Sequence, residues 1–503
     1  MTLRRLRWLL FAIFLIGTAT RVQHWYLGPR LYPDAYFQYL EPAWTRVSGF
    51  GMQTWEWRDG IRSWVLPSYH GAWMALLSSL SVKGSVIGSI IQLHWGLWSL
   101  FLVWAAWRGG CLIGRQASRR SAGDPNRPLF DPVSERDSFA ARAPEGWQAG
   151  VLAALLMALF PLLAVYSNEP LTELPSMIGL VCGLVLTAEL VERQRSASPR
   201  VAALVGFIVS LAVCLRVVNG ALALIPPLWL LVRGPRRMLL PMALGALLPV
   251  IVFGAVDRLT WGTFFGSFIK YVRFNVIEGR AAEFGTAPAR WYIDKLQARA
   301  PIGIWLMLVP ALFGVRVTWP HVLSALGILA LISSQAHKEE RFAIIIWPLL
   351  IIAAAGSAGR WLRPPQPSRT PRDELLWPAL PQVLYRIRQA LVLGAAVFVI
   401  AEAQQHLGNY DYALPRGRYD GQAWVGRQPD ATGVLLDWNF YTGGYLWLDN
   451  TLPQLKFESA LLSNPIFSHV IAPKGSSEVT QAKRAGFEVA YERDPILVLR
   501  RKR

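Results

Sequence analysis

Long apolar segments joined by short loops run through most of this sequence and constrain its fold more than any other feature. After a first run at 8–20, they lie near 85–107, 147–166, 174–191, 201–215, 221–232, 238–256, 302–315, 322–334, 343–358 and 384–402. The chain is 53% hydrophobic and 17% charged, whereas soluble domains carry about 25% charged residues. A straight span needs about 20 apolar residues, so we expect some of these helices to be broken. The pattern predicts an all-α, multi-pass membrane protein.

Arginines in the loops set the predicted orientation, because cytoplasmic loops carry an excess of Lys and Arg. Lys and Arg exceed Asp and Glu by 51 − 32 = 19, which in a soluble protein would suggest nucleic acid. Here the charge lies between apolar segments, so we expect membrane lipids and no nucleic acid as partners. The basic loops at 108–146, 193–200, 233–237 and 360–372 are placed in the cytoplasm, which requires 64–82 to lie at the membrane interface. The result is about eleven transmembrane helices, with the N-terminus inside and the C-terminus outside.

The two ends of the chain differ in character. The first apolar run follows three arginines, and we favour a retained anchor over a cleaved signal peptide because many spans follow. Past 403, short alternating runs predict strands at 434–438, 468–473, 487–491 and 496–499, and Ser476–Ala485 predicts a helix. We therefore predict a membrane domain over 1–403 and a soluble, extracytoplasmic α/β domain over 404–503. A Pro- and Arg-rich cytoplasmic linker is expected at 360–381.

Polar motifs gather on the predicted outer side. The first outer loop, 23–66, carries acids, an arginine and tryptophans: Asp34, Glu41, Trp55, Glu56, Arg62 and Trp64. An interfacial aromatic belt is the alternative interpretation, but such a belt does not require charged groups among the indoles. A site for a sugar phosphate does, because indoles stack on sugar faces and arginine pairs with phosphate oxygens.

A second outer motif is a run of five ionisable residues at a membrane edge, His337–Arg341. A solvated turn is the alternative. We interpret the run as a cradle for a lipid-linked phosphate, in which His337, Lys338 and Arg341 supply donors and charge. The large outer loop at 257–301 is shaped by Gly and Pro. Arg216, at the end of an apolar run, is interpreted as a snorkelling anchor.

The motifs Tyr32–Pro33–Asp34, Glu41–Pro42, Thr54–Trp55–Glu56 and Arg62–Ser63–Trp64 resemble the first luminal loop of glycosyltransferase family 22. That family contains the α-mannosyltransferases of N-glycan and GPI-anchor assembly. The run His337–Phe342 is similar to the family's His-Lys-Glu-x-Arg-Phe element, and Trp291–Tyr292 in the large outer loop is also similar. The resemblance covers roughly residues 5–358 and leaves out the C-terminal domain.

The resemblance implies a multi-spanning GT-C fold that moves a hexose, usually mannose, with inversion. The donor would be a polyprenyl- or dolichyl-phosphate sugar and the acceptor a glycan or glycolipid on the non-cytoplasmic face, with no metal and no cofactor. Asp34 maps to the acidic residue after Pro that the resemblance implies as the catalytic base, although Ala35 stands where a second acidic residue is usual. The active site would face the periplasm of a bacterial inner membrane, or the endoplasmic reticulum lumen in a eukaryote.

The residues themselves are consistent with this chemistry. An inverting transfer needs one carboxylate to accept the proton of the attacking hydroxyl, and Asp34 competes for that role with Glu41 and Glu56. The leaving phosphate needs fixed cations, which we assign to Lys338, Arg341 and Arg62, with His337 as a donor. The predicted sugar and acceptor contacts are Glu41, Trp55, Glu56, Trp64 and Tyr292.

Two further observations bear on the class of protein. The predicted cytoplasmic side carries no Asp-x-Asp motif for a nucleotide sugar and its metal, and Cys111, Cys182 and Cys214 form no metal-type cluster. The alternative function is a multi-pass transporter or lipid flippase. Such a protein should place polar groups at the bilayer midplane with repeat symmetry, whereas here they cluster at one interface, which favours the enzyme.

Overall fold

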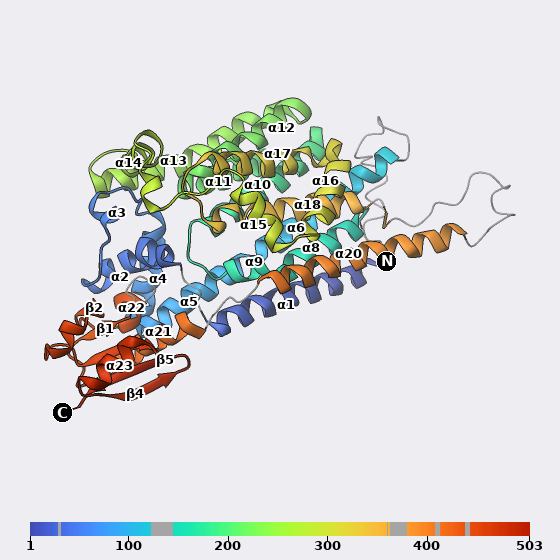
Figure 1. Ribbon diagram of the computed structural model, residues 1–503. Helices are drawn as coiled ribbons and strands as arrows, with labels where there is room; N and C mark the ends of the chain where they lie inside the picture. Colours follow the sequence, from blue (N-terminus) through green and yellow to red (C-terminus); the bar gives the residue numbers. More distant parts are fainter. Residues whose placement is uncertain are drawn as a thin grey trace, which may run out of the picture.

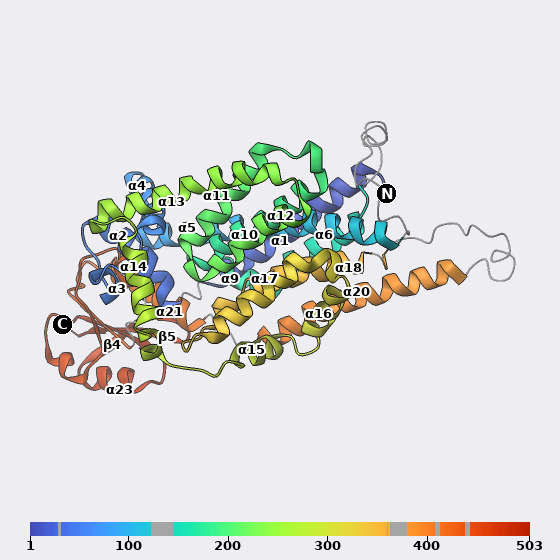
Figure 2. The same ribbon diagram turned by 90° about the horizontal axis from the view of Figure 1, so that it is seen from above.

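The apolar segments form helices that lie side by side in an elongated bundle (Figure 1, Figure 2). The computed structural model describes residues 1–28, 32–121, 144–359, 361–362, 380–407, 413–437 and 443–502. The N-terminus lies at one end of the bundle, and a small domain that contains a sheet lies at the other (Figure 1). The linker predicted at 360–381 and the basic loop predicted at 108–146 fall mostly outside the described residues.

The bundle is built from helices of very different lengths. They are α1 (Leu3–Leu27), α5 (Gly84–Trp98), α6 (Leu100–Ser121), α8 (Trp147–Leu159), α9 (Pro161–Tyr166), α10 (Glu173–Arg193), α11 (Pro199–Leu215), α12 (Ile225–Arg233), α13 (Leu239–Trp261), α16 (Gly303–Phe313), α17 (Val315–Ser334), α18 (Ile346–Ala358) and α20 (Leu380–Leu407). Among the described residues, seven helices are long and apolar enough to span a membrane, and a bent pair of helices would make an eighth. The multi-pass membrane fold is confirmed, while the count of about eleven spans stays a prediction.

A break between two helices of the bundle leaves backbone carbonyls that need hydrogen-bond donors. Helix α8 ends at Leu159 and α9 begins at Pro161, which has no N–H to offer to the carbonyl of Met157. Arg21, fully buried on α1, donates from Nη2 to that carbonyl at 3.2 Å and from Nη1 to the carbonyl of Ala158. The guanidinium therefore replaces hydrogen bonds that the interrupted helix cannot make.

Loops that were predicted to be cytoplasmic meet at one end of the bundle. Arg115 on α6 pairs with Glu192 at 3.0 Å, which brings the end of α6 beside the end of α10. Gln194 donates to the carbonyl of Arg233 at 2.9 Å, and Arg233 donates to the carbonyl of Arg316 at 2.9 Å. The contacts support the predicted grouping of these basic loops, and the sidedness of the membrane stays a prediction.

Short helices cover the opposite end of the bundle. They are a π-helical turn (Ala35–Leu40), α2 (Glu41–Ser48), α3 (Trp55–Arg58), α4 (Val65–Ser79), α14 (Gly266–Val272), a second π-helical turn (Arg273–Ile277), a 3-10 turn (Arg280–Phe284), α15 (Trp291–Arg299) and a 3-10 turn that opens α18 (Glu340–Ala343). The segment 64–82 forms the separate helix α4, which packs on α2 and α5. The first outer loop is thus a folded layer on the end of the bundle (Figure 1).

The C-terminal segment forms the predicted α/β unit. Its five strands are β1 (Val434–Leu436), β2 (Gln454–Lys456), β3 (His469–Pro473), β4 (Phe487–Arg493) and β5 (Ile496–Arg501), in the order β2-β1-β3-β5-β4. Strand β1 is parallel to β2 and β3, and β5 is antiparallel to β3 and β4. Helices α21 (Ala413–Val425) and α23 (Ser477–Arg484) pack on the sheet, and α22 (Gly444–Leu448) packs on α21. The Ser476 side chain caps α23. Four strands and the helix were predicted, and β2 was missed.

Candidate active site

A cavity of about 960 Å³ lies at the end of the bundle that the short helices cover. Its walls come from the first outer loop, from the starts and ends of bundle helices, from the segment after α13 and from the loop after α17. Segments far apart in the sequence therefore face one space. The predicted meeting of Asp34 with the run His337–Arg341 is observed, because Arg341 bonds Asp34 across 307 residues of sequence. Six predicted site residues line this cavity: Asp34, Trp55, Glu56, Arg62, His337 and Arg341.

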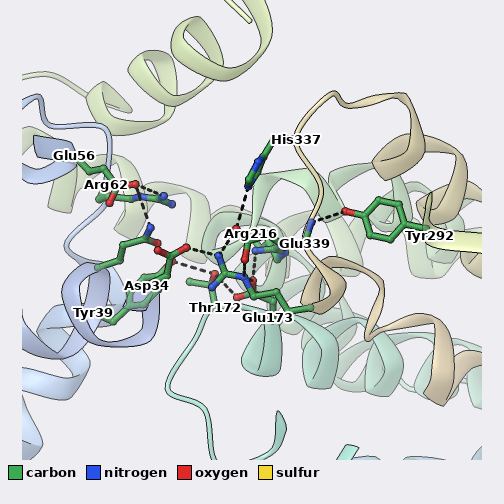
Figure 3. A network of polar contacts seen from close by, with 12 residues as sticks. Asp34, Tyr39, Glu56, Arg62, Thr172, Glu173, Arg216, Tyr292, His337 and Glu339 are labelled. Atoms are coloured by element: carbon green, nitrogen blue, oxygen red, sulfur yellow. Dashed lines mark hydrogen bonds and ion pairs between the residues drawn. The ribbon is translucent and has the colours of Figure 1, made fainter. Parts of the chain in front are cut away.

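The cavity wall is rich in opposite charges. Carboxylates of Asp34, Glu56, Glu173 and Glu339 share it with the cations of Arg62, Arg216 and Arg341 and with His337. Figure 3 shows two groups of contacts: Glu56 pairs with Arg62, and the other named side chains form a network around Arg341. Charges that face each other away from bulk water interact strongly, so the network fixes its members in place.

Arg341 stands at the centre of the network. It lies in the 3-10 turn before α18 and is 4% exposed. Its Nη2 donates to Asp34 Oδ2 and, at 2.9 Å, to Glu339 Oε1, and its Nε lies 3.3 Å from Glu173 Oε1. A buried cation needs such partners, and Arg341 has three carboxylates around it.

Glu173 joins a second arginine to this centre. It opens α10, and its Oε1 lies 2.9 Å from Nη1 of Arg216, which follows α11. Thr172 Oγ1 donates to Glu173 Oε2 at 3.4 Å and lies 3.2 Å from the hydroxyl of Tyr39. Arg216 also lies 4.6 Å above the ring of Phe342. The interpretation of Arg216 as a snorkelling anchor was wrong, because its guanidinium lines the cavity and pairs with a buried acid.

Asp34 and Glu56 occupy different surroundings in the first outer loop. Asp34 stands directly before the π-helical turn, a wide turn that is frequent at functional sites. Its side chain is 32% exposed, whereas that of Glu56 is 11% exposed. Glu56 Oε1 accepts from Gln38 Nε2 at 3.1 Å and from Arg62 Nε at 3.1 Å. Glu56 is thus held by its neighbours, and Asp34 presents more of its carboxylate to the cavity.

His337 and Glu339 form a pair on the far side of Arg341. His337 Nε2 lies 3.2 Å from Glu339 Oε1, and this hydrogen bond raises the pKa of His337. Burial would raise the pKa of Glu339, but the charge of Arg341 and the hydrogen bonds from His337 and Arg341 lower it to about 2. Glu339 is therefore ionised, and it favours the protonated form of His337.

Four predicted site residues lie outside the cavity lining. Lys338 Nζ donates to carbonyls at the end of α17, at 2.9 Å to Ser333. The hydroxyl of Tyr292 accepts from the N–H of Glu339 at 3.2 Å. Trp64 packs on the ring of Trp57 at 4.5 Å. Their predicted contacts with substrate stay predictions.

Glu41 is the fourth of these residues, and it is fully buried. Its carboxylate accepts from the backbone N–H groups of Met52, Tyr445 and Leu446, at 3.1, 3.2 and 3.3 Å. Burial raises the pKa of Glu41 to about 7, and the three backbone hydrogen bonds act in the opposite direction. The predicted contact of Glu41 with the acceptor stays a prediction.

Aromatic rings form an apolar wall of the cavity. The ring of Trp55 stacks on Phe284 at 5.8 Å and lies 5.0 Å from the ring of Phe274. All three line the cavity, and Phe274 and Phe284 come from the large outer loop. The site thus pairs a charged side with a side suited to a sugar face or a hydrocarbon chain. Over the described residues, no group of three His, Cys, Asp or Glu is placed to hold a metal ion.

Comparison with a solved structure shows which fold the chain has. The structure of ArnT from Cupriavidus metallidurans bound to undecaprenyl phosphate matches this chain with a TM-score of 0.55 at 12% identity, over 98% of this chain and 97% of that one. The fold is therefore the GT-C fold of membrane glycosyltransferases.

Sequence comparison then places the chain within that class. Residues 10–403 match the Alg9-like mannosyltransferase family, so the chain belongs to this family and is an enzyme of the hexosyltransferase class. GPI mannosyltransferase 3 of Yarrowia lipolytica is 25% identical over 411 residues, which are 80% of this chain and 68% of that protein. GPI mannosyltransferase 3 of Drosophila melanogaster is 23% identical over 373 residues, which are 70% of this chain and 57% of that protein. The transporter alternative is set aside.

Proposed function

We propose that this protein transfers mannose, with inversion, from a polyprenyl- or dolichyl-phosphate carrier to a glycan or glycolipid acceptor on the non-cytoplasmic membrane face. One observation carries the proposal: the partly exposed carboxylate of Asp34 shares a cavity with a buried, multiply paired arginine, Arg341. A relative adds support, because its name states a Dol-P-Man donor: the Dol-P-Man-dependent α-1,6-mannosyltransferase of Drosophila melanogaster. That protein is 36% identical over 111 residues, which are 21% of this chain and 16% of that protein. The ArnT structure also holds a polyprenyl phosphate.

Asp34 is the general base in this proposal. An acceptor hydroxyl is a weak nucleophile, so a carboxylate must accept its proton as the new bond forms at the anomeric carbon. The two competing acids are engaged elsewhere: Glu56 by Gln38 and Arg62, and Glu41 by backbone N–H groups. Exposure to the cavity therefore favours Asp34.

The leaving phosphate is assigned to the basic side of the cavity. When the bond between the anomeric carbon and the phosphate oxygen breaks, the electron pair stays on the phosphate, and fixed cations stabilise that charge. Inversion places this phosphate across the sugar ring from Asp34. Nη2 of Arg341 is engaged by Asp34 and Glu339, but Nη1 is buried without a hydrogen-bond partner among the described residues. We assign the phosphate to Nη1 and to His337, with Arg62 as a further cation.

The proposed donor is tested in one assay. The purified chain is reconstituted in vesicles with extracted lipids as acceptor and is given either radiolabelled mannosyl-phosphoryl polyprenol or radiolabelled GDP-mannose. We expect label in the acceptor only with the lipid donor. Transfer from GDP-mannose in the absence of any polyprenyl phosphate would refute the proposal, and an inactive Asp34→Asn variant controls for contaminating enzymes.

A further inference from the structure

The C-terminal domain contacts the segment that carries the proposed base, although none of its described residues lines the cavity. Its short helix α22 packs on α2 and α5 as well as on α21. Helix α2 directly follows the π-helical turn that begins after Asp34. Through α2, this domain therefore has a direct contact with the segment that carries Asp34.

The carboxylate of Glu41 is the polar part of this contact. Oε1 accepts from the N–H groups of Met52 and Tyr445, and Oε2 accepts from the N–H of Leu446. Met52 belongs to the first outer loop, whereas Tyr445 and Leu446 belong to α22, so one carboxylate bonds two segments more than 390 residues apart. When the Glu41 carboxylate is ionised, these hydrogen bonds are charge-assisted and stronger than neutral ones, and the carboxylate is fully buried.

Aromatic rings complete the contact around Glu41. The ring of Trp447 lies 5.7 Å from that of Tyr36, two residues after Asp34, and Tyr445 meets Phe50 at 4.6 Å. Gly88 on α5 gives room to the Trp447 ring, because a Cβ at this position would collide with it. The domain is therefore fixed on both the catalytic segment and the bundle.

We propose that Glu41 is a positioning residue that anchors α22 to the first outer loop, so that the C-terminal domain fixes the place of Asp34 without touching substrate. The inference rests on the proposed role of Asp34 as the base. It assigns Glu41 a role different from acceptor contact, and it gives a function to a domain that lies outside the family match over residues 10–403. Small displacements of a reacting group matter, because a misplacement of about 1 Å can reduce a rate about 100-fold.

Two glycines of the C-terminal domain provide a matched test. Gly444 has φ +50°, and a Cβ there would lie 2.6 Å from Cε1 of Tyr36 and 2.8 Å from Oε2 of Glu41. Gly475 has φ +80°, with no atom within 4 Å of its Cβ position. Gly444→Ala and Gly475→Ala therefore carry a similar backbone strain, and only the first presses on the Glu41 contact.

We expect Gly444→Ala to lower kcat by about tenfold or more with donor and acceptor KM within about twofold, and Gly475→Ala to change neither. Glu41→Gln, which keeps one acceptor oxygen, should lower kcat by less than Gly444→Ala does and serves as a second variant if Gly444→Ala does not fold. Equal kcat in Gly444→Ala, Glu41→Gln and Gly475→Ala would overturn the inference. A rise in acceptor KM alone in Glu41→Gln would instead support direct contact with the acceptor and also overturn it.

Hydrogen–deuterium exchange over residues 33–44 tests the contact between α22 and the first outer loop without an activity measurement. We expect faster exchange there in Gly444→Ala and Glu41→Gln and unchanged exchange in Gly475→Ala. Faster exchange with an unchanged kcat would refute the link to catalysis. If the wild-type chain does not use a lipid donor, the proposed function fails, whereas the exchange experiment still reports whether α22 holds the first outer loop.

Discussion

Replacing Asp34 by asparagine removes the charge of the proposed base and keeps the shape of its side chain. General acid–base groups contribute about 100- to 10,000-fold to a rate, so the barrier should rise by about 3 to 5 kcal/mol. Initial rates with a mannosyl-phosphoryl polyprenol donor should therefore fall by about 100- to 10,000-fold at saturating donor and acceptor. The donor KM should change little, because the variant keeps the groups assigned to the phosphate.

The fold should tolerate Asp34→Asn because of the neighbours of Arg341. That guanidinium also lies 3.3 Å from Glu173 and 2.8 Å from Glu339, so it keeps two carboxylates when Asp34 is neutralised. The Asp34 side chain is 32% exposed, and solvent screening limits the loss of stability to about 1 kcal/mol or less.

Glu173→Gln is the informative contrast. Its carboxylate is buried between Arg216 and Arg341, and breaking a buried pair costs about 3 to 5 kcal/mol. Thermal unfolding in detergent should separate the two variants clearly. Full activity of Asp34→Asn would show that Asp34 is not the base and would favour Glu56. A large loss of stability in the same variant would show that Glu173 and Glu339 alone do not compensate the charge of Arg341.

Three further predictions follow from the same contacts. Arg341→Ala should raise the donor KM far more than the acceptor KM, and an equal change in both would contradict a phosphate role. Glu339 raises the pKa of His337 above 6.5, so the imidazole is positively charged below pH 6.5 and loses that charge as the pH rises through the raised pKa. The donor KM should therefore increase as the pH rises past this value. His337→Gln should flatten the pH dependence of the donor KM. Arg21→Met should lower the free energy of unfolding by about 1 to 3 kcal/mol for each carbonyl left unpaired. We expect a lower Tm and an unchanged kcat of the folded protein. An unaltered Tm would rule out the capping role of Arg21.

Local sequence patterns predicted most of the elements. Four of the five strands of the C-terminal sheet begin within one residue of the predicted positions, because the apolar and polar pattern of a strand is a local property. Strand β2, Gln454–Lys456, was missed since three residues with one buried side chain show no usable period. The break between α8 and α9 was expected only in general terms, although Pro161 marks it.

The candidate site was predictable only in part. Asp34 and Arg341 each stood in a motif, so their meeting could be inferred from orientation. Glu173 and Arg216 were not predicted as site residues because each looks like an isolated charge at the end of an apolar run. Their pairing depends on the contact of α10 with α11. Two of the three backbone partners of Glu41 lie 404 and 405 residues away, and no local pattern could reveal that an acid in the first outer loop bonds the backbone of the C-terminal domain.

The arginine that caps α8 has a consequence for biogenesis. Helix α8 has 13 residues, about 20 Å, so it ends within the roughly 30 Å hydrocarbon thickness. Arg21 leaves the ribosome more than 130 residues before the carbonyls that it will bind. Until they arrive, the nascent first helix carries a guanidinium without these partners, which makes its insertion into the bilayer less favourable. Chains stalled before residue 157 should therefore hold their first helix in the bilayer less firmly than chains long enough for residues 157 and 158 to have left the ribosome.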